Sequence, residues 1–369
     1  MSLTHLTVSD SEVAAASEIR ALPCTSCAIC GKPGKILYRG LRDRLFTAPG
    51  NWNLKKCPDS ACGLLWLDPM PIVEDIAKAY ATYYTHGEHQ RPTPEPSSAD
   101  RLVRAIRQSY LAHTYGYSDL VQRTHGKTVS RLLGSLAYLH PFRRAWLDFS
   151  MMFLPYRPGG RLLEIGCGSG EMLRSFANSG WQTQGLDFDP AAVAASRAKG
   201  LRVELGTLED QFYDPARFDA VVMSHVIEHV HDPVGLLAEC RRILKPGGTL
   251  ALVTPNAGAL GHRLFGCSWF FLDPPRHLHI FTMAALRSAL LAAGFERSEY
   301  TFSSLRDAAE TFIGSNSIRR TARFQMGSHH NASEKLAGLT LQTAEWALLK
   351  CGVTVGEELV AVVEKEARC

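Results

Sequence analysis

Residues 161–170 read RLLEIGCGSG, and this stretch decides the fold of the chain. A short apolar run leads into glycines at positions 166, 168 and 170, and a helical pattern follows over residues 171–179. A buried strand, a glycine-rich turn and a helix form the βα unit typical of nucleotide-binding sheets, because glycine lets main-chain N–H groups approach a ligand closely. On this stretch alone, the alternative is an ordinary tight turn between a strand and a helix.

The residues that follow repeat the alternation of apolar strands and amphipathic helices. Helices are predicted over residues 190–199, 234–244 and 283–293. The further strands are predicted over residues 182–186, 202–205, 218–223, 249–254, 296–302 and 358–365. Such an alternation predicts an α/β protein with a parallel, doubly wound sheet that binds its ligands at the carboxyl ends of the strands.

Acidic residues stand where a nucleoside cofactor needs them. Asp187 ends the second strand about twenty residues after the glycine turn, where a carboxylate can accept hydrogen bonds from both ribose hydroxyls. Phe188 follows it and is placed to lie along an adenine ring, and Glu209, after the third strand, is placed to meet the adenine amine. Glu171 begins the helix after the turn, where it opposes an anionic pyrophosphate and tolerates a cationic sulfonium cofactor.

Together these motifs resemble those of class I S-adenosylmethionine-dependent methyltransferases, in the group with an N-terminal zinc-ribbon segment. EIGCGSG, GLDFDP, FDAVVMSHVIEHV and LKPGGTLALVTPN resemble that family's glycine-rich, ribose-binding, fourth-strand and fifth-strand motifs, over residues 161–295. The resemblance implies a Rossmann-like sheet of seven mostly parallel strands, the last one antiparallel, and S-adenosylmethionine as the cofactor. The positions it implies for holding or lining the cofactor are Glu164, Gly166, Cys167, Gly168, Gly170, Asp187, Phe188 and Glu209.

Five of the ten cysteines fall between residues 24 and 62. Cys27 and Cys30 form one closely spaced pair and Cys57 and Cys62 another, and each pair is followed by a glycine that permits a tight turn. This glycine favours Cys27 and Cys30 over Cys24 as the first pair. Four thiolates predict a closed, structural zinc site. Reduced cysteines in a small core are the alternative, and disulfides are a weaker one.

Methyl transfer requires an aligned nucleophile and often a base, and histidine suits that role near neutral pH. His277, in the loop DPPRHLHIF after the fifth strand, is the predicted base, with His225 as the second candidate. For both histidines the alternative is a purely structural role, in which the imidazole only hydrogen-bonds to the backbone. Arg276 is predicted to hold an anionic substrate group or to pair with a neighbouring aspartate.

The segment 225–229 spells HVIEH, which also matches the inverted zinc-protease pattern HxxEH. Relatives that act on catechol-like quinone precursors carry ExxEH at this place and bind a divalent metal there. The third alternative is that Glu228 and His229 only brace the following helix. The residues leave these alternatives open.

The chain divides by composition into four segments. The pattern over residues 100–153 is helical, and its apolar face, which we expect to pack on the neighbouring domain, consists of Leu132, Leu133, Leu136, Ala137 and Leu139. A membrane-surface role is the weaker alternative, suggested by Arg143, Arg144, Trp146 and Phe149. Residues 309–325 are basic and polar and are expected to be mobile. The predicted segments are a loose N-terminus (1–22), a zinc ribbon (23–70), a helical connector or lid (71–158) and a methyltransferase domain (159–369) with an insertion at about 305–352.

A formal net charge of +4 is too small to argue for a nucleic-acid partner, and no apolar run reaches the roughly 18 residues of a membrane span. No signal-peptide pattern is present, so a cytoplasmic protein is expected. The leading hypothesis is methyl transfer to a small molecule, such as a sugar or another polar biosynthetic intermediate. The alternatives are a non-catalytic scaffold of this fold, and a nucleic-acid or protein methyltransferase that uses the zinc ribbon for recognition.

Overall fold

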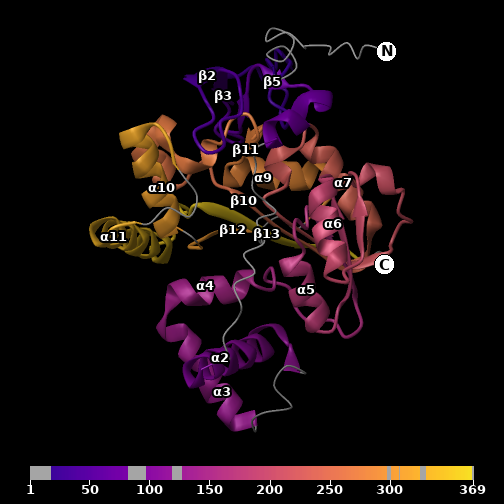
Figure 1. Ribbon diagram of the computed structural model, residues 1–369. Coiled ribbons are helices and arrows are strands. Elements are labelled where there is room, and N and C mark those ends of the chain that lie inside the picture. Colours follow the sequence, from indigo (N-terminus) through magenta and orange to yellow (C-terminus); the bar gives the residue numbers. More distant parts are fainter. Residues whose placement is uncertain are drawn as a thin grey trace, which may run out of the picture.

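A seven-stranded sheet forms the centre of the computed structural model, which describes residues 18–81, 97–118, 127–296, 301–306, 308–324 and 330–367. Its strands are β6 (Arg161–Ile165), β7 (Gln182–Asp187), β8 (Val203–Leu205), β9 (Phe218–Ser224), β10 (Leu244–Pro255), β12 (Thr301–Ser304) and β13 (Glu358–Glu364). They lie in the order β12-β13-β10-β9-β6-β7-β8, and β13 runs antiparallel to both of its neighbours (Figure 1). The remaining pairs are parallel. The predicted fold is confirmed.

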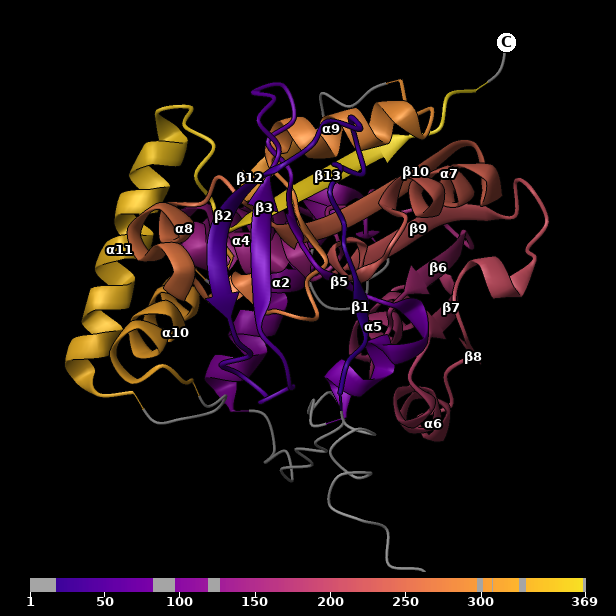
Figure 2. The ribbon, with the colours of Figure 1, turned by 90° about the horizontal axis from the view of Figure 1, so that it is seen from above.

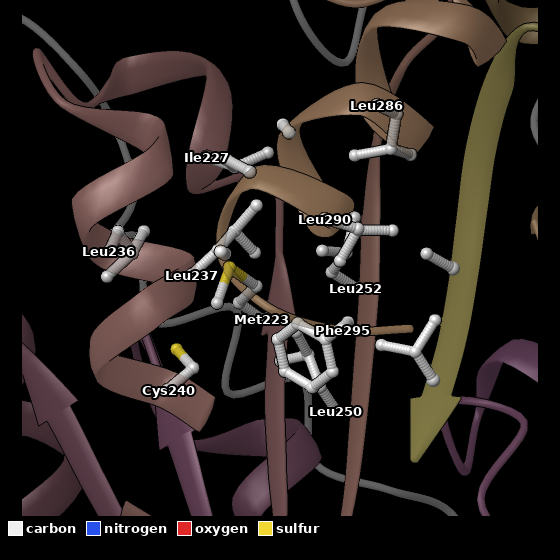
Figure 3. Close-up of a cluster of buried hydrophobic side chains, with 14 of the residues drawn as sticks. Met223, Ile227, Leu236, Leu237, Cys240, Leu250, Leu252, Leu286, Leu290 and Phe295 are labelled. Carbon is white, nitrogen blue, oxygen red and sulfur yellow. The ribbon is translucent and has the colours of Figure 1, made fainter. Parts of the chain in front are cut away.

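Helices cover both faces of this sheet because successive strand residues point to opposite sides. On one face, Met223 of β9 and Leu252 of β10 are fully buried against α7 (Pro233–Ile243) and α9 (Met283–Ala292), as Figure 3 shows. Their chain neighbours Val222 and Val253 belong to the core on the other face. That core is closed by α5 (Glu171–Asn178) and α6 (Pro190–Ala198). Each fully buried Leu or Val side chain contributes about 1.5–3 kcal/mol to stability.

The strand and helix boundaries differ from the predicted ones by one or two residues in most elements. Strand β10 begins at Leu244, five residues earlier than predicted. Four residues of the predicted sixth strand, 297–300, lie outside the described residues. Residues 1–17 of the predicted loose N-terminus also lie outside them.

A second, four-stranded sheet joins the N-terminal segment to the main domain. Its strands are β2 (Lys35–Leu41), β3 (Trp52–Lys56), β4 (Leu65–Leu67) and β11 (His279–Ile280), in the order β11-β4-β3-β2. The short strands β1 (Ala21–Leu22) and β5 (Met70–Pro71) pair beside it and lead into the 3-10 helix η1 (Val73–Tyr80). Because β11 belongs to the loop after β10, the N-terminal strands continue into the loop that carries His277.

Three helices form a group at the opposite end of the molecule from β2 and β3 (Figure 1). They are α2 (Ser98–Tyr115), α3 (Lys127–Ser135), which continues as the 3-10 helix η3 (Leu136–Leu139), and α4 (Pro141–Phe149). Helix α2 begins with a capping box between Ser97 and Asp100. The predicted apolar face does not pack as one unit: Ala137 is buried, whereas Leu132, Leu136 and Leu139 are exposed, so the expectation is wrong for these three leucines.

Two helices lie between β12 and β13, where the sequence predicts an insertion. They are α10 (Ala308–Thr321) and α11 (Ala332–Lys350), and Figure 2 shows them beside α8 (Leu260–Phe265). The expectation of a mobile segment is wrong for α10, whose Phe312, Ile313 and Ile318 are buried. Its small residues allow close packing, since a Cβ added to Gly314 would lie 2.7 Å from the ring of Phe270. Among the residues described, no helix is long and apolar enough to cross a membrane.

Candidate active site

The glycine turn after β6 lies at the carboxyl edge of the sheet and is open at Gly168. Gly166, Gly168 and Gly170 adopt φ angles of 68°, 52° and 77°, which L-residues with a side chain rarely adopt. The carbonyl of Leu186 fixes the turn by accepting hydrogen bonds from the N–H groups of Gly166 and Cys167 at 2.7 and 3.1 Å. A Cβ added to Gly168 would meet no atom within 4 Å. The backbone at Gly168 therefore faces free space.

Asp187 ends β7 beside this turn. Its carboxylate accepts hydrogen bonds from the N–H groups of Gly168 and Asp189, at 2.7 and 2.9 Å. Phe188 is half exposed, and the ring of Tyr80 meets it edge-on with the ring centroids 5.3 Å apart. Glu209 is exposed at the start of the 3-10 helix η4 (Glu209–Gln211), after β8. The predicted ribose and adenine positions thus lie on neighbouring strands of one sheet edge.

Glu164, inside β6, is buried and one of its carboxylate oxygens, Oε2, has no hydrogen-bond partner among the described residues. Burial, and then the negative charge of Asp187, raise the pKa of Glu164 well above its usual value. An unpartnered buried carboxyl group is costly, and a cationic ligand with N–H donors would remove this cost. The carboxylates at this edge therefore fit a cofactor that combines a nucleoside with a positively charged end.

Glu171 does not have the role that its sequence position predicts, which is to favour a cationic cofactor. Its carboxylate is paired with Arg174 at 2.6 Å and with Lys199 at 3.0 Å, so two cations neutralise it. Its charge therefore does not select a cationic cofactor. The carboxyl group that favours a cationic ligand at this edge is that of Glu164.

His225 follows β9 and is held by two buried carboxylates. Its Nδ1 lies 3.1 Å from Oε1 of Glu228, and its Nε2 lies 2.9 Å from Oε1 of Glu358. Burial alone would lower the pKa of His225, but these two hydrogen bonds outweigh burial and raise the pKa to about 9. This pKa favours a proton on both ring nitrogens near neutral pH, which leaves no lone pair to act as a base. Nε2 also lies 3.1 Å from Nη2 of Arg306, which competes with it for Glu358.

Arg306 completes this charged group. Its guanidinium pairs with Glu358, with Nε 3.1 Å from Oε2, and it lies 3.6 Å from the ring centroid of Phe149 in α4. The group therefore links β9, β13 and the helical segment around one buried carboxylate. Glu358 is the first residue of β13. Because β13 and β10 are antiparallel, Glu358 pairs with Pro255 and lies at the sheet edge where β10 ends.

His277 is buried and held in one tautomer. Its Nδ1 lies 2.8 Å from the carbonyl oxygen of Phe271, which can only accept, so Nδ1 carries the proton and Nε2 keeps its lone pair. Burial, and then the nearby His229, lower the pKa of His277 to about 4. The ring centroids of His229 and His277 are 4.8 Å apart. Near neutral pH, His277 is thus an uncharged imidazole. Its Nε2 has no hydrogen-bond partner within the described residues, since Oδ2 of Asp273 lies 3.9 Å away.

Glu228, His229 and His277 each offer one ligand atom within 4.8 Å of the others. His225 does not belong to this cluster, so the two histidines of the HVIEH segment do not form a zinc-protease pair. Glu228 already accepts hydrogen bonds from His225 and, at 2.9 Å, from Thr254. Two imidazoles and one carboxylate are poor ligands for magnesium, which prefers oxygen, and better ones for a transition metal.

Arg276 is not available to a substrate. Its side chain is fully buried and pairs with Asp273 and, at 2.8 Å, with Asp43. It also donates to the carbonyl oxygen of Ala79 at 3.0 Å and lies 4.8 Å from the ring centroid of Phe46. Of the two predicted roles, pairing with an aspartate is the one that the structure shows. The pairing joins the His277 loop to the N-terminal sheet.

The four predicted zinc ligands meet at one point. Sγ of Cys27 lies 3.6 Å from Sγ of Cys62, Sγ of Cys30 lies 3.3 Å from Sγ of Cys57, and all four sulfurs lie within 4.8 Å of one another. Four sulfurs arranged tetrahedrally at 2.3 Å from zinc are about 3.8 Å apart, so the cluster fits the ion after small shifts. None of the four is in a disulfide, and Cys24 lies outside the cluster.

This cluster also contacts the loop of His277. The hydroxyl of Thr282, the N-cap of α9, donates a hydrogen bond to the carbonyl oxygen of Cys62. Strand β11 pairs with β4 through His279↔Trp66 and Ile280↔Leu65. The loop is therefore fixed by the N-terminal sheet at Arg276, along β11 and at Thr282.

The sequence did not identify Glu358, Arg306, Tyr80 or Asp43 as members of the site. Glu357 and Glu358 stand directly before the apolar run LVAVV, and two acidic residues at the start of a buried strand are a signal that could have been used. Arg306, Tyr80 and Asp43 have no comparable local signal. They reach the site only through the tertiary fold.

Known proteins share the central part of this chain. A family profile described as "Methyltransferase domain" matches residues 138–299. A ubiquinone biosynthesis O-methyltransferase of Xylella fastidiosa is 30% identical over 168 residues, which cover 44% of this chain and 65% of the relative. The protein with the same description from Thiobacillus denitrificans is 30% identical over 176 residues, which cover 44% of this chain and 74% of the relative. The chain thus spans about two thirds to three quarters of the length of these relatives.

Among solved structures, the phosphoethanolamine N-methyltransferase 2 of Haemonchus contortus in complex with S-adenosyl-L-methionine shares 16% identity at a TM-score of 0.42. The match covers 68% of this chain and 60% of that chain. The sequence matches, together with the strand order and the glycine turn, show that this chain belongs to the class I S-adenosylmethionine-dependent methyltransferases.

Proposed function

We propose that this chain transfers the methyl group of S-adenosylmethionine to a small molecule, such as a sugar or another polar biosynthetic intermediate. The observation that carries the proposal is the carboxyl edge of the sheet. There Glu164 has a buried oxygen that no described residue partners, and Asp187 accepts a hydrogen bond from Gly168, whose Cβ position is open. The relatives are named O-methyltransferases, so oxygen is the accepting atom that we propose.

S-adenosylmethionine supplies an electrophilic methyl group on a sulfonium when it is bound. Asp187 would receive the ribose hydroxyls and Phe188 the adenine ring, while Glu164 would face the cationic end of the cofactor. Gly166, Cys167, Gly168 and Gly170 would form the wall behind it, with Glu209 toward the adenine amine. A side chain at Gly168 would project into the space that this arrangement needs.

His277 is the base that we propose. Its Nε2 has a lone pair, its Nδ1 is fixed by Phe271, and its low pKa keeps the ring uncharged at neutral pH. It would take the proton of the acceptor hydroxyl as the oxygen attacks the methyl group in line with the departing sulfur. We do not propose His225 as a base, because its imidazolium already donates to Glu228 and Glu358. We propose instead that His225 holds a positive charge between Glu228 and Glu358.

The N-terminal cysteines are proposed to hold one structural zinc ion through Cys27, Cys30, Cys57 and Cys62. The separations of the four sulfurs support this proposal. The ion would have no open coordination position, so we assign it no chemical step. Its contribution would be to stabilise the sheet that fixes the His277 loop.

The proposal is tested with labelled S-adenosylmethionine and the small-molecule fraction of a cell lysate, from which the labelled product identifies the acceptor. With that acceptor, His277→Ala should lower turnover by about 100-fold or more while the affinity for S-adenosylmethionine stays the same. His279→Ala is the matched control, because His279 is also buried, donates to a backbone carbonyl at 3.1 Å and has a pKa lowered to about 4. Equal losses in the two variants would show that His277 is only a structural brace.

The dependence of turnover on metal and on pH separates a base from a metal ligand. If the cluster of Glu228, His229 and His277 holds a transition metal, turnover should depend on added metal and disappear with a chelator that leaves the zinc cluster loaded. If His277 acts as a base, turnover is independent of added metal and falls with acid near the low pKa of His277. No binding of S-adenosylmethionine at all would instead indicate the non-catalytic scaffold, and salt-sensitive binding of RNA or DNA the nucleic-acid methyltransferase.

A further inference from the structure

An apolar stripe runs along α3 and η3 on the solvent side. It consists of Val129, Leu132, Leu136 and Leu139, at spacings of three, four and three residues, which places them on one helical face. Leu132 and Leu139 are 71% and 80% exposed. We refer to these four residues as the α3 stripe.

The opposite face of the same helix carries small residues and faces the protein. Ser130, Gly134 and Ala137 are buried, and a Cβ added to Gly134 would lie 3.1 Å from the backbone of Ser109 in α2. The helix thus packs closely through its small residues and turns its large apolar side chains outward. A soluble surface helix normally has the reverse arrangement.

The same group of helices exposes further apolar side chains. Of the 20 large hydrophobic residues exposed in the described part of the chain, eight lie between residues 97 and 153. Besides the α3 stripe they are Leu102, Val103, Tyr138 and Trp146. Apolar residues that are concentrated in this way, and not scattered singly, indicate an interaction surface.

The net positive charge of the protein is concentrated in the same segment. Residues 97–153 contain eight Lys and Arg and three Asp and Glu, so their net charge is +5, whereas the rest of the chain has −1. Arg101, Arg104, Arg131 and Arg143 are exposed. The described acids are engaged locally, since Asp100 caps α2 and Asp148 accepts hydrogen bonds from Tyr110 and Tyr115. Arg144 lies 3.8 Å from Asp148 and over the ring of Tyr138, so the exposed Arg101, Arg104, Arg131 and Arg143 are the cations that an anionic partner would meet.

We propose that the α3 stripe and the arginines around it dock on the surface of an anionic lipid bilayer. Leu and Val side chains would enter the boundary between headgroups and acyl chains, while the guanidinium groups pair with lipid phosphates. A second copy of this chain would bring the same +5 segment against itself, so it lacks charge complementarity. Nucleic acid would match the arginines but would leave the exposed leucines without an apolar environment.

The test is co-sedimentation of the full chain with vesicles of phosphatidylcholine alone and of phosphatidylcholine mixed with phosphatidylglycerol, at low and high salt. We expect binding to the anionic vesicles that weakens with salt and is at least about tenfold weaker on phosphatidylcholine alone. The double variant Leu132→Glu/Leu139→Glu should lose this binding. Because both side chains are exposed, the thermal unfolding midpoint should stay close to that of the wild type.

A matched control comes from α11, where Leu336 and Leu339 are also exposed. Leu336→Glu/Leu339→Glu should bind the vesicles as the wild type does, and Arg131→Glu/Arg143→Glu should weaken binding and reduce its dependence on salt. Equal binding to both vesicle types, or equal loss in the α3 and α11 variants, would overturn the proposal. Light scattering that shows a dimer which only Leu132→Glu/Leu139→Glu dissociates would also overturn it, in favour of a second copy.

Discussion

Removing Arg276 should uncouple the N-terminal sheet from the loop that carries His277. We choose Arg276→Met because methionine keeps most of the volume of the side chain and removes its charge. The wild-type guanidinium is fully buried between the carboxylates of Asp43 and Asp273, whose side chains are 0% and 8% exposed. The variant leaves both carboxylates buried without their cation.

The expected cost follows from this geometry. Breaking a buried ion pair by removing one partner typically costs about 3–5 kcal/mol, because the remaining charge is uncompensated. Asp43 keeps the hydrogen bonds from three backbone N–H groups, at 2.7–3.0 Å, whereas the carbonyl oxygen of Ala79 loses its donor. These two effects oppose each other, so we expect a loss of about 3–5 kcal/mol in the free energy of unfolding at pH 7.

The assay is urea unfolding followed by tryptophan fluorescence at several pH values. Burial favours a raised pKa for Asp43, but Arg276 and the backbone N–H groups outweigh it and hold the pKa below its usual value. Without Arg276 this pKa should rise, so protonation relieves the buried charge and the loss becomes smaller as the pH falls. Arg174→Met is the control, because its ion pair with Glu171 is exposed and should contribute less than about 1 kcal/mol. A loss no larger than that of the control would refute the coupling.

Two further predictions concern the metal and the pH dependence of stability. Metal analysis should find about one zinc per chain. The Cys62→Ser variant should lose this zinc and the Cys24→Ser variant should keep it. Equal zinc in both variants would contradict the assigned ligands. The pKa of His225 is about 9 in the fold against an ordinary value of 6.5, so its stabilising effect is complete below pH 6.5 and is lost as the pH rises toward 9. At 1.36 kcal/mol per pKa unit this effect is about 3 kcal/mol, and His225→Asn should flatten the curve of stability against pH over that range; an unchanged slope would contradict the His225 assignment.

The sheet could be predicted from the sequence because its signals are local. The glycine turn, the acidic end of β7 and the alternation of strands and helices each lie within a few consecutive residues. The predicted boundaries of most strands lie close to the observed ones for the same reason. The cysteine cluster was also predictable, since each pair of thiols and its glycine are neighbours in the sequence.

The surroundings of the histidines could not be predicted in this way. His225 is held by Glu358, 133 residues away, and Arg276 by Asp43, 233 residues away. These contacts depend on the order of the strands and on the pairing of β11 with β4. The sequence pattern therefore identified His225 as a titratable group at the right edge without showing that two carboxylates hold it protonated.

The helix at 127–139 shows a different limit of the sequence pattern. The predicted face combined Leu132, Leu136 and Leu139 with Ala137, but an apolar pattern alone does not say which side chains meet the core. The small residues Ser130, Gly134 and Ala137 permit the closest approach to α2, and they take the inner position. The leucines consequently lie outside.

Titration calorimetry with S-adenosylmethionine tests the central claim most directly. We predict one site per chain in the wild type, and a loss of at least about tenfold in affinity for Gly168→Ala, because the new methyl group enters the space assigned to the cofactor. Gly200→Ala is the matched control: Gly200 also has a positive φ, 77°, and a Cβ there also meets nothing within 4 Å. Its affinity should equal that of the wild type. No binding by the wild type, or equal affinities for the two variants, would contradict the account.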